Sequence, residues 1–209
     1  MNIVVVLVVL LFSVIVHEIM HGVVAGWFGD STAEDEGRIT LNPIPHIDPF
    51  GTIALPILMY FTQASLGIAH PIVFGAAKPV PVNFARLRPY RLGIIAVSLA
   101  GPVSNFLLAI IALLLLGFGV GDLLPGSDVV LGTVAFYNIL LGTFNLIPIP
   151  PLDGSKVIVA FLPESLMQQL LSLERYGFVL IFILLYMGVL DKVLIPVLNL
   201  FATVFGVRF

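Results

Sequence analysis

An apolar run at residues 3–28 carries the sequence His-Glu-Ile-Met-His at positions 17–21. Ionisable side chains are costly inside a membrane-length apolar segment, so this cluster requires a specific function. Residues four positions apart on a helix lie on one face, one turn from each other. His17 and His21 can therefore share one zinc ion, and Glu18 can act as general base on water at the metal. The alternative is a polar cluster that only holds helices together, a role that suits three ionisable groups at metal-ligand spacing poorly.

The composition of the chain indicates an integral membrane protein. Its 209 residues are 59% hydrophobic and only 10% charged, and the mean hydropathy is +1.14. The formal net charge of -3, without any basic stripe, argues against a nucleic-acid partner. The sequence has no cysteine, which excludes disulfides and thiolate ligands, so a bound metal must use nitrogen and oxygen ligands.

The apolar segments predict an all-α, multi-pass membrane protein with five transmembrane helices in the lipid bilayer. Residues 1–2 lack the positive charge of a signal peptide, so we expect the first segment to be retained as a span. Residues 156–174 resemble an amphipathic interfacial segment, and the two segments after them are short for a full crossing. The five expected spans are residues 3–28, 92–119, 129–147, 176–190 and 193–207.

The region between the first two spans is expected to hold two unusual elements. Residues 51–69 are apolar but are interrupted by Pro56, Gln63 and Gly67, so we expect a re-entrant or hairpin segment that enters the bilayer and returns. Residues 70–90 contain four prolines, two of which alternate with valine. This pattern predicts a loop with a short membrane-associated β hairpin.

A catalytic zinc requires a third protein ligand and an open position for water. Asp153 is the strongest candidate, because the proline-rich break before it frees the backbone from helical geometry and Gly154 after it permits a close approach. Its alternative role is to cap the segment that follows. Asp48 and His46 are alternative ligands or groups that support the ligands, and His70 is expected to be structural or interfacial.

Asn105 and Asn145 are the remaining polar groups expected at membrane depth. Each amide can hydrogen-bond the backbone of an extended peptide substrate. The alternative is a bridge between helices, which stabilises a membrane bundle by about 1 kcal/mol per residue. For Asn105 the sequence supports both roles equally.

The direction of the spans follows from the requirement that Asp153 meets the two histidines. The two histidines lie towards the C-terminal end of their span, and Asp153 lies just past the C-terminal end of its own, so these spans must run parallel, with an odd number of crossings between them. Residues 51–69 should therefore not cross. With the N-terminus outside, eight Lys and Arg residues then lie in the cytoplasm and one outside, against seven and two if residues 51–69 cross. We thus expect an active site that faces the cytoplasm.

Three motifs, in this order, resemble those of the site-2 protease family of intramembrane zinc metalloproteases. They are HEIMH at 17–21, Ala-Gly-Pro-Val-Ser-Asn at 100–105 and Asn-x-x-Pro-x-Pro-x-Leu-Asp-Gly at 145–154. The resemblance covers residues 3–160, the catalytic core of a single domain at residues 1–209 whose closing helices are residues 175–207. No PDZ insertion or nucleotide-binding regulatory domain fits in this length, which indicates a compact subgroup.

The resemblance implies one Zn2+ per chain, held by His17, His21 and Asp153, with Glu18 as the catalytic base. It also implies that Asn145 contacts the substrate backbone, and related enzymes place a membrane re-entrant β element where this chain has residues 78–83. Family members cleave single-span, membrane-anchored substrates within the bilayer after a first cut elsewhere, often to release regulators.

We therefore expect hydrolysis of peptide bonds in the transmembrane segments of membrane-anchored proteins, in a prokaryotic cell membrane. A membrane metal-ion transporter is the first alternative, because it also places histidine and aspartate beside broken helices, but the sequence has no inverted repeat. A non-proteolytic family member that acts as a scaffold is the second, and the intact Glu18 speaks against it. No feature of the sequence indicates an oligomeric state.

Overall fold

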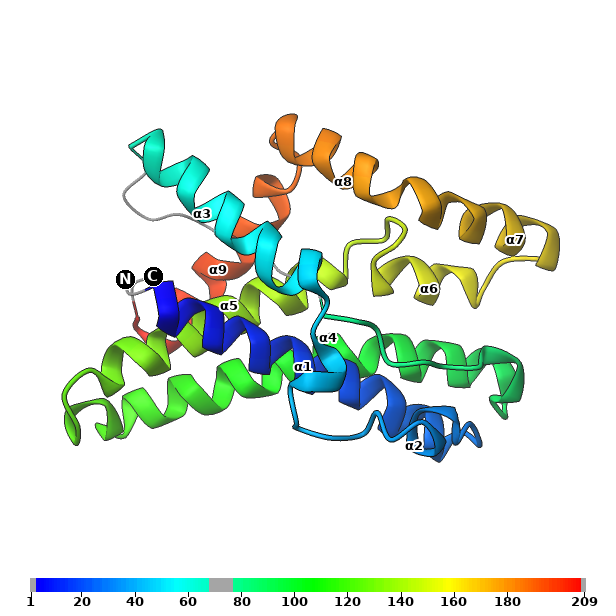
Figure 1. The fold of residues 1–209 in the computed structure, drawn as a ribbon, viewed down its shortest axis with the longest axis horizontal. Helices are drawn as coiled ribbons and strands as arrows, with labels where there is room; N and C mark the ends of the chain where they lie inside the picture. Colours follow the sequence, from blue (N-terminus) through cyan, green and yellow to red (C-terminus); the bar gives the residue numbers. More distant parts are fainter. Residues whose placement is uncertain (1–2, 68–76, 208–209) are drawn as a thin grey trace.

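The computed structural model describes residues 3–67 and 77–207, and every regular element in these ranges is a helix (Figure 1). Three helices are long and apolar enough to cross a membrane: α1 (Ile3–Trp27), α4 (Tyr90–Gly117) and α5 (Ser127–Asn145). The prediction of an all-α membrane protein is therefore confirmed at the level of three spans.

The spanning helices α1 and α5 run in the same direction, and α4 runs against them in contact with both (Figure 1). α4 and α5 approach closely at Gly142, where a Cβ atom would lie 3.1 Å from the Phe106 ring and from the Pro102 carbonyl oxygen. Small residues at such crossings let helix backbones pack closely, which matters in a membrane because apolar surface alone gives little driving force. The parallel course of α1 and α5 is the arrangement that a site shared between their C-terminal ends requires.

The last two expected spans correspond to helices that are shorter than a bilayer. α8 (Gly177–Tyr186) has 10 residues and α9 (Asp191–Phe205) has 15, so they are about 15 and 23 Å long, against a hydrocarbon thickness of about 30 Å. α7 (Glu164–Ser172), the 3-10 turn at Leu173–Tyr176 and α8 follow one another as a nearly continuous rod in Figure 1. The remaining elements are α2 (Thr32–Asp35), α3 (Leu55–Ser65), α6 (Asp153–Val159), α7 (Glu164–Ser172), α8 (Gly177–Tyr186), α9 (Asp191–Phe205), 3-10 turns at Ile44–His46, Phe84–Arg86, Val120–Asp122 and Leu173–Tyr176, and a π-helical turn at Pro49–Ala54.

Two apolar clusters flank the histidine motif along α1. On its N-terminal side, Leu10 belongs to a cluster with Leu140 of α5 and Leu194 of α9. On its C-terminal side, Ala25 belongs to a second cluster that includes Ile94 of α4. Because α1 is packed on both sides of the motif, the ionisable groups between the clusters are held against protein rather than lipid.

Residues 47–77 form an excursion whose two ends meet. The Lys78 amide donates to the carbonyl oxygen of His46, 2.9 Å away. The π-helical turn and α3 lie on the outward part of this excursion, and residues 68–76 lie outside the described ranges. The chain therefore returns at Lys78 to the position that it left at His46, and Met59 and Tyr60 of α3 pack against the apolar core.

The β hairpin expected at residues 70–90 is not supported in the part of this region that the structure describes. Residues 77–83 have no regular structure and lead into a 3-10 turn, whereas residues 70–76 lie outside the described ranges. Pro79 and Pro81 lack the backbone amides that a strand needs to form a ladder along one of its edges. The alternation of proline and valine therefore resembles a strand in sequence but cannot pair as one on that edge.

Residues 77–89, the link into α4, are instead fastened to the end of α1 by hydrogen bonds. Arg38, which is only 7% exposed, donates to the carbonyl oxygens of Lys78 and Pro79 at 3.0 and 3.2 Å. Further along, the Arg88 amide donates to the carbonyl oxygen of Phe28 at 2.8 Å. The segment thus lies in a fixed position beside the last turns of α1.

Asp30 makes the central contact of this fastening. One of its carboxylate oxygens accepts the Asn83 amide at 2.6 Å, and the other accepts both the amide and the hydroxyl of Thr32. Burial alone would raise the pKa of Asp30, but these hydrogen bonds and the nearby Arg86 outweigh it and lower the pKa below its ordinary value. Asp30 is therefore a carboxylate at neutral pH and a strong acceptor for the segment that it holds.

Candidate metal centre

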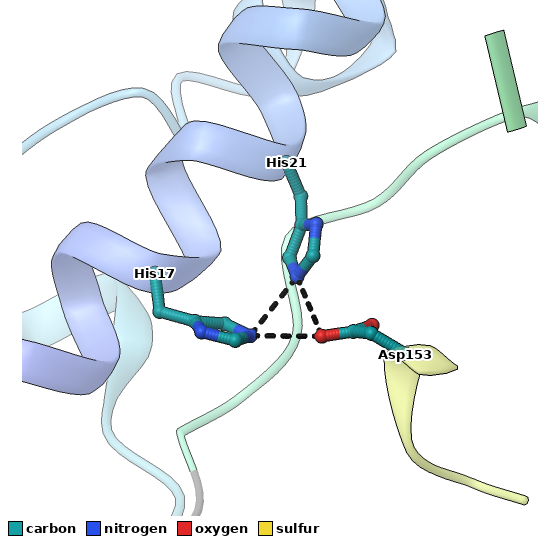
Figure 2. Close-up of side chains that lie close together, drawn as sticks. All are labelled: His17, His21 and Asp153. Atoms are coloured by element: carbon teal, nitrogen blue, oxygen red, sulfur yellow. Dashed lines mark hydrogen bonds and ion pairs between the residues drawn. The ribbon is translucent and has the colours of Figure 1, made fainter. Parts of the chain in front are cut away.

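The side chains of His17, His21 and Asp153 converge on one point (Figure 2). The two Nε2 atoms are 3.0 Å apart, and Oδ2 of Asp153 lies 3.0 Å from Nε2 of His17 and 3.2 Å from Nε2 of His21. All three residues are buried. The helical spacing on α1 and the start of α6 thus bring together the three residues that the sequence predicts as metal ligands.

The far nitrogen of each imidazole has an acceptor beside it. Nδ1 of His21 lies 2.6 Å from the carbonyl oxygen of Val97, and Nδ1 of His17 lies 2.6 Å from Oδ1 of Asn105. With a proton on each Nδ1, both Nε2 atoms of the neutral imidazoles carry lone pairs. They face each other and the carboxylate of Asp153, so three acceptors meet without a donor. Such a group repels unless a positive ion, a proton or a metal, lies between its members.

The space beside these atoms fits a zinc ion. Zinc bonds to nitrogen and oxygen of about 2.0–2.1 Å place the ligands of a tetrahedral site roughly 3.3 Å apart, close to the observed separations of 3.0–3.2 Å. Gly101 of α4 keeps this space open, because a Cβ atom there would lie 2.5 Å from Nε2 of His17 and 2.6 Å from Nε2 of His21. Two imidazoles and one carboxylate leave a fourth position free, as in catalytic zinc sites.

Asp153 reaches the histidines because the chain turns sharply after α5. α5 ends at Asn145, and Gly154 packs so tightly against the carbonyl oxygen of Leu146 that any Cβ atom would overlap it. Lys156, in the first turn of α6, lies with its Nζ 3.4 Å from Oδ1 of Asp153. This contact occupies one carboxylate oxygen and leaves Oδ2 directed at the histidines.

Glu18 lines a cleft of about 420 Å3 that also reaches His21 and Asp153. Its Oε2 atom accepts a hydrogen bond from the Val80 amide at 2.8 Å, so the link into α4 holds the carboxylate in place. Much of the remaining lining is apolar and comes from that link, α4, α6 and α7: Pro79, Val82, Ile94, Val97, Val159 and Met167. Two metal-ligand candidates and a basic carboxylate therefore share one cavity with room for water and a peptide.

Comparison with known proteins identifies the family of the chain. The model of peptidase family M50 matches residues 122–189. YwhC of Bacillus subtilis is 38% identical to the chain over 197 residues, which cover 91% of the chain and 84% of YwhC. The chain belongs to the site-2 protease family, peptidase family M50.

Other relatives of this site-2 protease agree. Rip2 of Mycolicibacterium smegmatis is 32% identical over 185 residues, 87% of the chain and 66% of Rip2. MJ0392 of Methanocaldococcus jannaschii is 33% identical over 73 residues, 35% of the chain and 21% of MJ0392. YwhC, Rip2 and MJ0392 are all named as zinc metalloproteases, and no solved structure is matched significantly. The chain is an integral membrane zinc metalloprotease of the intramembrane type, and neither the transporter nor the scaffold alternative gains support.

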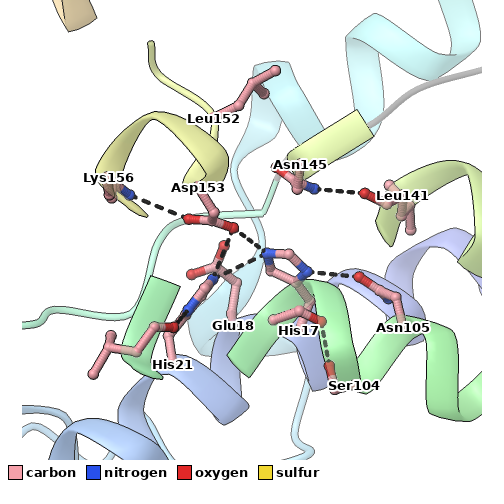
Figure 3. Close-up of polar contacts among 12 residues, drawn as sticks. His17, Glu18, His21, Ser104, Asn105, Leu141, Asn145, Leu152, Asp153 and Lys156 are labelled. Atoms are coloured by element: carbon pink, nitrogen blue, oxygen red, sulfur yellow. Dashed lines mark hydrogen bonds and ion pairs between the residues drawn. The ribbon is translucent and has the colours of Figure 1, made fainter. Parts of the chain in front are cut away.

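The two asparagines predicted to contact substrate occupy different positions in the site-2 protease (Figure 3). Asn105 is fully buried behind His17, where its Oδ1 lies 2.6 Å from the imidazole. Of the two roles left open by the sequence, this position favours the bridging one. Asn145 is half-buried at the end of α5, and its amide donates to the carbonyl oxygen of Leu141 at 3.0 Å. Its contact with substrate stays a prediction.

The other candidate ligands lie apart from the metal centre. Within the described residues, His17, His21 and Asp153 form the one cluster that could hold a metal ion. His46 is fully buried, and its Nε2 lies 2.9 Å from the carbonyl oxygen of Thr40. Asp48 accepts the Gly51 amide and caps the π-helical turn. Both residues therefore shape the loop, and His70 lies outside the described residues.

Three residues that contact or lie behind the candidate ligands were not predicted from the sequence. Lys156 contacts Asp153, while Asn138 and Ser13 lie behind Asn105. Asn138 and Ser13 are polar residues inside spanning helices, which is the signal that could have identified them. Lys156 follows Asp153 by three positions on the same helix, a spacing at which side chains meet.

Proposed function

We propose that this site-2 protease binds one zinc ion through His17, His21 and Asp153 and uses Glu18 as a general base. The substrates are membrane-anchored proteins, which are cut within or near their transmembrane segments. The observation that carries the proposal is the convergence of three buried acceptor atoms next to Glu18 on one cleft. Residues 1–209 form a single domain built around this site.

The metal and the side chains of the protein have separate roles in peptide-bond hydrolysis. A zinc ion held at this site would polarise the scissile carbonyl and activate water for attack. Glu18 takes the proton of the attacking water and passes it to the leaving amine. The Val80 amide binds Oε2 of Glu18 and so leaves Oε1 to accept that proton. Lys156 and Asn105 keep the metal-binding atoms of Asp153 and His17 aimed at each other.

The substrate enters this site as an extended chain. A transmembrane helix has no free backbone amides, so the scissile region must unwind before water can reach its carbonyl. The half-buried amide of Asn145, at the end of α5, then contacts the substrate backbone beside Asp153. The apolar walls of the cleft suit the side chains of a membrane segment.

The proposed membrane topology is the one expected from the sequence. α1, α4 and α5 cross the bilayer, and the shorter α8 and α9 complete five spans with help from flanking residues. Residues 51–69 do not cross, which is supported by the hydrogen bond that joins the ends of this excursion, between His46 and Lys78. The N-terminus lies outside, and basic residues near the end of α1, such as Arg38 and Arg88, lie in the cytoplasm of a prokaryotic cell.

The decisive variant is Glu18→Gln, which keeps the size of the side chain but removes the base. We expect a folded protein with a full zinc complement and at least a thousandfold slower cleavage of a helical membrane substrate in proteoliposomes, within the range that loss of a general base produces. Glu34→Gln, on the exposed surface of α2, is the matched control and should cleave normally. Normal cleavage by Glu18→Gln would exclude the mechanism.

A further inference from the structure

A series of hydrogen bonds between buried side chains, here called the amide chain, leads from the metal centre into the bundle. Nδ1 of His17 contacts Oδ1 of Asn105 at 2.6 Å, and Nδ2 of Asn105 contacts Oδ1 of Asn138 on α5 at 2.8 Å. Nδ2 of Asn138 then contacts Oγ of Ser13 at 2.8 Å, back on α1 one turn before His17. Asn105 and Asn138 are 0% exposed and Ser13 is 4% exposed. The amide chain therefore connects all three spanning helices behind the proposed metal ligand His17.

The polarity of this chain is fixed by backbone carbonyl groups, which can only accept hydrogen bonds. The side chain of Asn138 contacts the carbonyl oxygen of Val134 at 2.8 Å, so its NH2 group must face that oxygen. The Oδ1 atom of Asn138 must then face Asn105. An acceptor at that position requires the NH2 group of Asn105 opposite it.

A second carbonyl group fixes Asn105 independently. Its Nδ2 atom lies 3.3 Å from the backbone oxygen of Ser13, which again requires a donor. With both donors of Asn105 directed at Asn138 and Ser13, its Oδ1 atom faces His17 and accepts from Nδ1. The proton of the neutral His17 imidazole is thereby held on Nδ1, and Nε2 presents its lone pair to the metal position.

We propose that Asn138 is a positioning residue for the zinc ligand His17 and acts through Asn105, with Ser13 completing the chain. The proposal rests on the metal-binding role given above to His17. Asn138 lies two hydrogen bonds from the ligand, so it fixes the tautomer and ring orientation of His17 without touching metal or substrate. Its own orientation is set by α5, the helix that ends just before the turn carrying Asp153.

A purely structural role predicts a different pattern. Amides that only join helices would stabilise the bundle, and removal of Asn138 would lower the free energy of unfolding without changing the rate of zinc release. A positioning chain is broken completely by the loss of either member. The effects on zinc should then not add, because the interaction lost in the second variant is already absent in the first.

The test measures how fast zinc leaves the purified, zinc-loaded protein in an excess of chelator. Asn138→Leu is expected to accelerate release about 10- to 100-fold, the usual effect of removing an outer partner of a metal-bound histidine. Asn105→Leu should have a similar effect, and the double variant should release zinc no faster than the faster single variant. Thr133→Val removes another buried hydroxyl of α5 and should release zinc at the wild-type rate.

Two further measurements keep the proposal testable if Asn138→Leu fails to fold. Ser13→Ala removes one contact and is expected to accelerate release about threefold, on the scale of one net hydrogen bond of roughly 0.6 kcal/mol. Nitrogen-15 NMR of histidine-labelled, zinc-loaded protein should show Nδ1 of His17 protonated in the wild type. Additive effects of Asn105→Leu and Asn138→Leu, or wild-type release in both, would overturn the proposal. Failure of the proposed function looks different, because the wild type itself would then bind no zinc.

Discussion

At the scale of single residues, each proposed metal ligand has a contact on the side away from the proposed metal position. His17 has Asn105 at its far nitrogen, His21 has the Val97 carbonyl, and Asp153 has Lys156 at its second oxygen. These contacts fix the donor atoms before a metal arrives, so little ordering is needed when it binds. The same arrangement leaves no room for a side chain at position 101, where Gly101 faces both imidazoles.

Gly101→Ala tests how tightly the ligand atoms are placed. Its methyl group would lie 2.5–2.6 Å from both Nε2 atoms and would push the imidazoles apart. We expect at least a hundredfold weaker zinc binding by chelator competition, while the metal-free protein keeps its helix content because alanine favours a helix over glycine by about 1 kcal/mol. Gly132→Ala, in α5 with no atom near the new methyl group, should bind zinc normally. Wild-type affinity in Gly101→Ala would contradict the geometry.

Residue patterns are enough to indicate the proposed ligand set, because its residues are spaced locally or stand out in the sequence. The spacing of His17 and His21 needs only a helix, and Asp153 stands out after a proline-rich break. The amide chain behind His17 needs tertiary structure, since Asn138 is 33 positions from its partner Asn105 and on another helix. No local pattern indicates which buried asparagine meets which.

At the scale of elements, the link between the excursion and α4 is one wall of the cleft. It has no strand ladder, and its position depends on individual side-chain contacts with Glu18, Asp30 and Arg38. The sequence suggested a β hairpin here because prolines alternate with valines. That expectation did not account for the amides that Pro79 and Pro81 lack, or for the side chains that replace a partner strand.

The lowered pKa of Asp30 gives the fastening of this link a pH dependence. The carboxylate form is favoured by folding, so its contribution is complete above about pH 4, the ordinary range of an aspartate, and is lost as the pH falls through the lower pKa of the folded state. At pH 6, Asp30→Asn should lower the protection of the Asn83 amide from hydrogen exchange by about 1–2 kcal/mol. Hydrogen exchange by mass spectrometry, corrected for intrinsic rates, measures this change.

The control for this prediction is Asp35→Asn, an exposed carboxylate whose hydrogen bond joins it to Ser31 on the surface. It should leave the exchange of residues 77–89 unchanged. Equal protection of the Asn83 amide in Asp30→Asn and the wild type would show that the carboxylate does not hold the link.

At the scale of the whole molecule, the chain must bring water to a site enclosed by spanning helices. The parallel helices α1 and α5 position the proposed ligands, α5 through the turn into α6, and the antiparallel α4 supplies Gly101 and Asn105 (Figure 1). Sequence composition identified three spans securely, because each is a long apolar helix. The C-terminal spans were harder to assign, since α8 and α9 are shorter than a bilayer and their boundaries depend on packing.

The proposed topology can be tested directly because the chain has no cysteine of its own. Single cysteines are placed at Glu36, in the loop after α1, and at Leu124, between α4 and α5, both exposed. In whole cells, a membrane-impermeant thiol reagent should label Leu124→Cys and leave Glu36→Cys unlabelled until the cells are opened. Leu66→Cys, at the end of α3, should resist the reagent from outside if residues 51–69 return without crossing. Labelling of Glu36→Cys in intact cells would reverse the orientation.

The central claim is that one zinc ion is held jointly by α1 and by the aspartate that begins α6, and zinc retention by Asp153→Asn tests it most directly. After dialysis against a weak chelator, the wild type and Asp128→Asn, an exposed control at the start of α5, should each keep one zinc per chain. Asp153→Asn should keep less than a tenth of that amount, because an amide is a far poorer zinc ligand than a carboxylate. A full zinc complement in Asp153→Asn would contradict the account.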